Sequence, residues 1–136
     1  QLTYLNVSQN VKLQTLEFSE SNISTVDLSR NVNLENLILS DSPISYLDLK
    51  NNTKLVFINA ENVGAGLKSI VDNLPYVPVE AEADIWVRVE AIANSIQDKC
   101  RFKNWEATFE KENKNVLGRE RIVQKNSLNY MLPLPR

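Results

Sequence analysis

Apolar residues recur with a period of 21 along the first sixty positions of the chain. A shift of 21 positions aligns residues of one class in six columns. The apolar columns are Leu5, Val26 and Leu47; Val7, Leu28 and Leu49; Leu13, Leu34 and Leu55; Leu16, Leu37 and Ile58; and Phe18, Leu39 and Ala60. The polar column is Asn10, Asn31 and Asn52. A single 21-residue turn cannot cover its own apolar centre, so the period predicts successive turns stacked into parallel coils, with the aligned leucines in continuous buried columns.

Within each turn the apolar residues often lie two positions apart, as in the pair Leu16 and Phe18. Residues two apart on an extended segment point to the same side, and the residue between them points to solvent. The asparagine column follows such a segment, where the chain turns. An asparagine side chain can bond to backbone groups that a bend leaves unpaired. We therefore predict an asparagine ladder between coils.

Two phrases carry a family resemblance: Val26-Asp27-Leu28-Ser29-Arg30-Asn31, followed by Leu34, and Leu47-Asp48-Leu49-Lys50-Asn51-Asn52, followed by Leu55. They resemble the "LDLS.N..L" half-repeat of bacterial, Bacteroidetes-type leucine-rich-repeat proteins, over residues 2–63. The resemblance implies an α/β leucine-rich-repeat solenoid of about three 21-residue repeats with an α/β C-terminal cap. It also implies a secreted or cell-surface protein. Ser21 and Ser42 stand where the family has Cys or Asn.

After Val63 the 21-residue period ends, and we divide the chain into repeats (1–63), a capping segment (64–110) and a tail (111–136). The spacing predicts a helix over 67–74, a loop over 76–83, a strand over 84–89 with Trp86 on its opposite face, a helix over 90–100 and a strand over 105–109. The order helix, strand, helix, strand resembles the closing segment of the same family. The tail is predicted to be partly extended, with a strand over 116–123. It is either flexible or an arm that docks on a neighbouring molecule.

Composition excludes several kinds of chemistry. The chain has no His, which removes the commonest general base and metal ligand, and its single cysteine, Cys100, cannot form an intrachain disulfide. We expect Cys100 to be a buried packing residue. No phosphate-binding glycine motif occurs, and no apolar run reaches the roughly 18 residues of a membrane helix. We therefore expect no enzyme, no cofactor, no bound metal and no membrane insertion.

The residues between the buried positions of the strands form a surface whose chemistry varies from coil to coil, as a recognition surface requires. We predict that a protein, such as a host protein, or a glycan binds here. Ile38 beside Phe57 would be an apolar anchor within a polar rim. The predicted partner-binding residues are Thr15, Glu17, Asn36, Ile38, Phe57, Asn59 and Glu61. The other half of each repeat exposes residues whose chemistry recurs, which favours a scaffold role; they are Tyr4, Asn6, Ser8, Thr25, Asp27, Ser29, Tyr46, Asp48 and Lys50.

Three alternatives have weaker support. Asp27 and Asp48, one period apart, could form the carboxylate pair of a hydrolase or a metal-binding surface. The first coil should expose apolar residues, which would allow self-association or a further N-terminal part. Residues 99–136 contain 9 basic and 4 acidic residues, against 4 and 7 in residues 1–63, although the chain's net charge is only −2. Nucleic-acid binding, which we do not expect, would use Lys99, Arg101, Phe102, Lys103, Trp105, Arg119 and Arg121.

Overall fold

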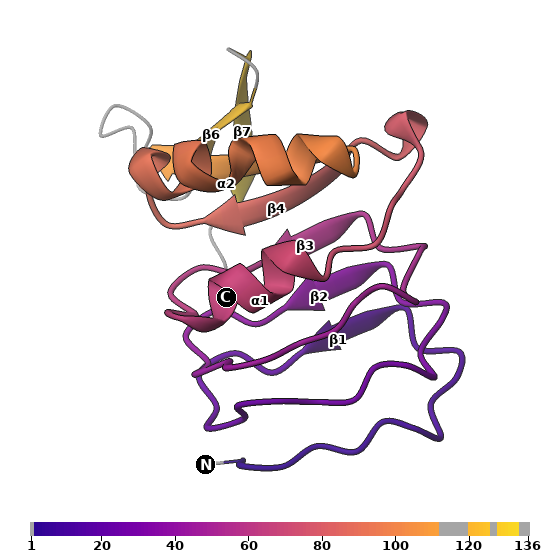
Figure 1. Cartoon of the computed structure of the whole chain (residues 1–136). Coiled ribbons are helices and arrows are strands. Elements are labelled where there is room, and N and C mark those ends of the chain that lie inside the picture. Colours follow the sequence, from indigo (N-terminus) through magenta and orange to yellow (C-terminus); the bar gives the residue numbers. More distant parts are fainter. Residues whose placement is uncertain (1, 112–119, 126–127, 134–136) are drawn as a thin grey trace.

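A computed structural model describes residues 2–111, 120–125 and 128–133, with side chains from Leu2 to Phe109 (Figure 1). The chain forms an α/β fold around one seven-stranded sheet whose strand order follows the sequence. The first five strands are parallel and the last two are antiparallel. The strands are β1 (Thr15–Glu17), β2 (Asn36–Ile38), β3 (Phe57–Asn59), β4 (Ala83–Val87), β5 (Trp105–Lys111), β6 (Glu120–Lys125) and β7 (Leu128–Pro133).

The predicted stacking is confirmed for the column that begins at Leu16. Leu16 is in register with Leu37, and Leu37 with Ile58, in parallel ladders. The column continues through Ile85 to Ala107. All five side chains are buried, so one apolar core runs along the inner side of the parallel strands.

The two helices, α1 (Gly66–Asp72) and α2 (Glu90–Phe102), lie on one side of the sheet (Figure 1). The short 3-10 helix η1 (Val79–Ala81) precedes β4. Helix α1 stacks on the extended segment of the preceding coil and is held there by two hydrogen bonds. The Leu49 amide donates to the Asn73 carbonyl (3.1 Å), and the Leu47 amide donates to Ser69 Oγ (3.0 Å). After the third turn, therefore, a helix occupies the layer that extended chain occupies in the first three turns.

Both predicted helices are confirmed, although α1 ends at Asp72 rather than at residue 74. A proline disfavours helical geometry in the residue before it, and Leu74 precedes Pro75. Lys103 Nζ compensates for the lost helical bonds by donating to the carbonyls of Asp72 (3.1 Å) and Leu74 (3.0 Å). Cys100 is buried in α2 as predicted, and its burial raises the pKa of the thiol to about 12.

The predicted asparagine ladder is confirmed at its two inner members. Asn31 Nδ2 donates to the backbone carbonyls of Val7 (3.0 Å) and Asn10 (2.9 Å). Asn52 Nδ2 repeats the pattern one coil later, on Leu28 (3.0 Å) and Asn31 (2.9 Å). Both side chains are fully buried and each reaches the coil before it, so the ladder holds successive coils at a fixed spacing.

Three predicted strands have different bounds in the structure. Strand β5 ends at Lys111 rather than at 109. Strand β4 ends at Val87 rather than at 89, and Val89 is exposed at the N-cap of α2. Of the predicted strand over 116–123, residues 116–119 lie outside the described part of the chain, and β6 and β7 form an antiparallel hairpin on β5. The backbones of these two strands pair within the chain, and the expectation that the tail is flexible or docks on a neighbouring molecule stays a prediction.

Candidate functional site

Most of the predicted partner-binding residues are outward-facing residues of β1, β2 and β3, and they lie in two in-register columns. Thr15 pairs with Asn36, and Asn36 with Phe57. Glu17 pairs with Ile38, and Ile38 with Asn59. We call this surface, with Trp86 of β4, the sheet face. Glu61 lies two residues after β3, and its amide donates to Asn59 Oδ1 (3.0 Å).

The exposure predicted for this surface is partly wrong. Ile38 and Phe57 are half-buried, and Asn59 is buried with 6% of its surface exposed. Trp86 causes part of this burial, since it packs edge-on against Phe57 with 5.3 Å between ring centroids and is in register with Asn59. In addition, Ile38 has Glu17 and Asn59, rather than Phe57, as its in-register neighbours. The predicted apolar anchor therefore reduces to Ile38.

A groove of about 270 Å³ crosses the end of the sheet face and has Ile38 in its lining. Its walls carry the carboxylates of Glu17, Glu20, Asp41 and Glu61, and the guanidinium of Arg88. Ser19 and Ser40 lie in the lining with their hydroxyls 3.0 Å apart. The groove is therefore predominantly acidic around one apolar residue.

The sequence prediction missed Glu20, Asp41 and Arg88 as parts of this groove. The first two stand at coil corners in left-handed conformation, with φ of 57° and 61°, and Asn62 repeats the corner with φ of 57°. The 21-residue spacing of these three positions was a signal that could have placed them together. Arg88 lies 27 positions after Glu61 and carries no such signal.

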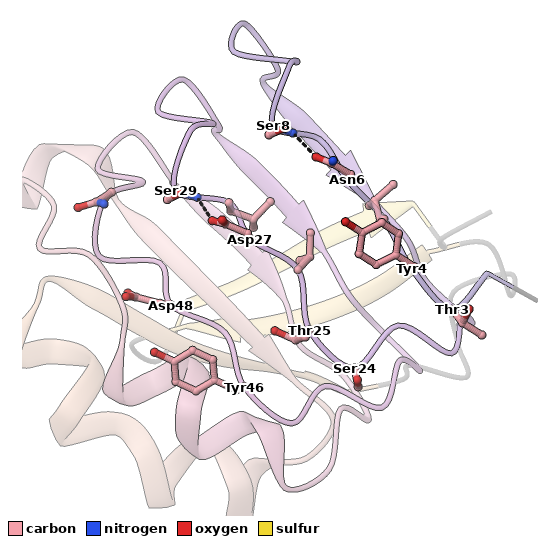
Figure 2. Close-up of a pocket in the computed structure, with 14 residues that line it drawn as sticks. Thr3, Tyr4, Asn6, Ser8, Ser24, Thr25, Asp27, Ser29, Tyr46 and Asp48 are labelled. Atoms are coloured by element: carbon pink, nitrogen blue, oxygen red, sulfur yellow. Dashed lines mark hydrogen bonds between the residues drawn. The ribbon is translucent and has the colours of Figure 1, made fainter.

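On the opposite side of the core, the outward residues of the extended segments form a second surface, the coil face (Figure 2). It comprises Tyr4, Asn6, Ser8, Thr25, Asp27, Ser29, Tyr46, Asp48 and Lys50. A cavity of about 580 Å³ lies here, between the two tyrosines and over Thr25. Asn6, Asp27 and Asp48 each accept a hydrogen bond from the backbone amide two residues later, at 2.9 to 3.0 Å. These turns orient the three side chains alike.

The geometry of Asp27 and Asp48 does not favour a hydrolase. Of the two carboxylic groups in such an enzyme, the general acid needs a raised pKa. Hydrogen bonds from Ser29 instead lower the pKa of Asp27. Within the described ranges, no group of three or more carboxylate or thiol side chains is placed to hold a metal ion.

The basic residues proposed for nucleic-acid binding are largely engaged within the protein. Lys99 pairs with Asp72 (3.1 Å) and Arg101 with Glu106 (2.9 Å). Trp105 is buried, and its Nε1 donates to the Pro75 carbonyl (2.9 Å), so its ring cannot stack on a base. Phe102 is exposed on α2. Arg119 lies outside the described residues, as does the side chain of Arg121.

Among the helices that the structure describes, none is long and apolar enough to cross a membrane. No protein-family model, curated protein or solved structure matches this chain.

Proposed function

We propose that this chain is a leucine-rich-repeat interaction module, a solenoid closed by an α/β cap, that binds a basic segment of a partner protein through its sheet face. The observation that carries the proposal is the groove whose lining contains Ile38, four carboxylate side chains and a single cationic side chain, Arg88. An apolar contact within a charged rim is the usual composition of a protein-binding hot spot. Because most charged side chains of the groove are carboxylates, the groove favours a partner segment rich in Lys and Arg.

Other features of the chain support binding rather than catalysis. The chain lacks His, the pKa of Asp27 is lowered rather than raised, and the Cys100 thiol is buried. The family resemblance extends the proposal to a secreted or cell-surface protein, in which the groove meets partners outside the cell.

The test begins with photo-cross-linking in the growth medium and cell-surface fraction of the organism that makes the protein, because the proposed partner lies outside the cell. A photoreactive amino acid replaces Thr15 on the sheet face in one variant and Asn94 on α2 in another. We expect a protein partner to be cross-linked from position 15 and not from position 94. Equal cross-linking from both positions would contradict a specific surface.

Binding of the purified partner is then measured by calorimetry with two charge-reversal variants. Glu17→Lys/Glu20→Lys should weaken binding at least about tenfold, because the rim then repels a basic segment. The control, Glu80→Lys/Asp98→Lys, changes net charge equally at two exposed residues that do not line the groove and should leave affinity unchanged. Equal losses in both variants, or none in the first, would remove the groove from the proposal.

A further inference from the structure

The coil face carries two exposed tyrosines that make no ring contact among the described side chains. Tyr4 is 71% exposed and Tyr46 is 53% exposed. Covering an aromatic ring of this size is worth about 1.5–3 kcal/mol, so two uncovered rings on one surface are a source of binding energy for a ligand. Scattered exposed aromatic residues are ordinary, but these two line the same cavity.

The spacing of the rings follows from the 21-residue repeat. Tyr4, Thr25 and Tyr46 occupy the same position in three successive coils. Adjacent coils stack at about 4.8 Å, so the two tyrosines are about 10 Å apart along the stack. In Figure 2 both rings turn a face toward the viewer, and the smaller Thr25 lies between them. The surface therefore offers two flat apolar platforms separated by about the length of one disaccharide.

Polar groups accompany the platforms at the same period. Asn6, Asp27 and Asp48 run beside the tyrosine column, each oriented by its hydrogen bond to a backbone amide. Carboxylate, amide and hydroxyl groups in fixed positions can pair with the hydroxyls of sugars, and the C–H faces of sugar rings stack on aromatic rings. The cavity lining contains two carboxylates and no lysine or arginine, which disfavours an anionic ligand.

We infer that the coil face binds a linear neutral polysaccharide that lies along the stack of coils. Two of its sugar rings stack on Tyr4 and Tyr46, while Thr25, Asp27 and Asp48 hydrogen-bond to the hydroxyls between and beside them. A periodic ligand fits this face because the face is itself periodic. This inference is independent of the protein-binding sheet face on the other side of the core.

The test is calorimetric titration of the whole chain with cellohexaose, laminarihexaose, mannohexaose and xylohexaose, and with hexagalacturonate as the anionic counterpart. We expect at least one neutral hexasaccharide to bind with a Kd below about 1 mM and hexagalacturonate not to bind. No neutral binding up to that concentration would overturn the inference, as would tighter binding of hexagalacturonate.

Two sets of variants locate the site. Tyr4→Ala/Tyr46→Ala should weaken binding of the neutral sugar at least about tenfold, whereas Tyr76→Ala, an equally exposed tyrosine beside Phe102 on the cap, should not. Tyr46→Ala alone should give a measurable part of the loss if the double variant folds poorly. Undiminished binding by the folded double variant would refute the site.

Two further variants separate this inference from the proposed function. Asp27→Asn/Asp48→Asn should weaken binding of the neutral sugar, because its hydroxyls lose two carboxylate acceptors, and should admit hexagalacturonate, because the repelling charges are gone. Glu17→Lys/Glu20→Lys should leave sugar binding unchanged. Sugar binding that is lost in this sheet-face variant would contradict a separate site on the coil face.

Discussion

The buried asparagines show how one polar side chain holds two coils together. Asn52 lies fully inside the protein, yet both of its Nδ2 hydrogen bonds go to backbone carbonyls of the preceding coil. Those carbonyls lie at a bend, where the strand ladder does not extend. Each of them also accepts a hydrogen bond from a backbone amide within its own bend, Leu28 from Asn31 (3.0 Å) and Asn31 from Leu34 (3.2 Å). The asparagine side chain therefore supplies the second hydrogen bond of each carbonyl, and these second bonds link one coil to the next.

We expect Asn52→Ala to lower the free energy of unfolding by about 1–3 kcal/mol, because two buried hydrogen bonds between coils, each worth about 0.5–1.5 kcal/mol, would be lost. The matched control is Asn10→Ala, since Asn10 holds the same repeat position but is exposed, and its change should stay within about 0.5 kcal/mol. Urea unfolding measures both. Equal effects at the two positions would show that the ladder contributes nothing specific.

At the scale of elements, α1 takes the place that a fourth extended segment would occupy after the third coil, and close packing makes this possible. Gly66, the first residue of α1, has its Cα directly against the backbone of Ile44 in the preceding coil. A Cβ at this position would overlap the Ile44 carbonyl oxygen. The glycine lets the helix approach the coil closely enough for the Leu47 amide to bond to Ser69 Oγ.

We expect Gly66→Ala to destabilise the protein by at least about 2 kcal/mol, because the backbone of either the helix or the coil must shift. Gly64→Ala is the control. A Cβ added at Gly64 would meet no atom within 4 Å, but the residue has a φ of 68°, so only backbone strain of about 1 kcal/mol should appear. Thermal and urea unfolding of both variants measure whether Gly66→Ala is the more destabilising of the two. A Gly66→Ala loss no larger than that of Gly64→Ala would contradict the close approach.

At the scale of the whole molecule, each coil is supported by its neighbours along one axis. Strands β2, β3 and β4 have a partner on both sides, whereas β1 has a described partner only in β2. The first coil also exposes apolar side chains, with Leu2 52% and Val11 43% exposed. In stacked structures the stability of each repeat is the sum of its own folding free energy and the free energy of its contacts with the adjacent repeats.

We therefore expect amide hydrogen exchange to be graded along the stack. Amides of β3 and β4 should exchange at least about 100-fold more slowly than those of residues 3–13, because the first coil can open without disturbing the rest of the core. Exchange measured by NMR or mass spectrometry at several concentrations checks this gradient. Uniform protection along the stack would contradict it, and protection of the first coil that rises with concentration would indicate self-association there.

The candidate site was predictable only in part. The two outward columns, one with Glu17 and Ile38 and the other with Thr15 and Asn36, followed from alternation within the strands and from the 21-residue register. The burial of Asn59 did not, because it depends on Trp86, which enters the sheet 27 positions later, after an irregular segment. Arg88 reaches the groove for the same reason. Contacts between a repeat and a non-repeating segment produce no periodic pattern in the sequence, so the pattern cannot predict them.

By itself, the sequence determined the stacking of the first three coils, their inward residues and the asparagine ladder. Each depends on one local rule repeated every 21 residues, so alternation and turn chemistry suffice to place them. Only the tertiary structure decided how the segments after the third coil pack on the coils and on one another. The close approach at Gly66, the addition of the β6–β7 hairpin to β5 and the partial burial of the sheet face by Trp86 each arise from packing between segments that share no pattern.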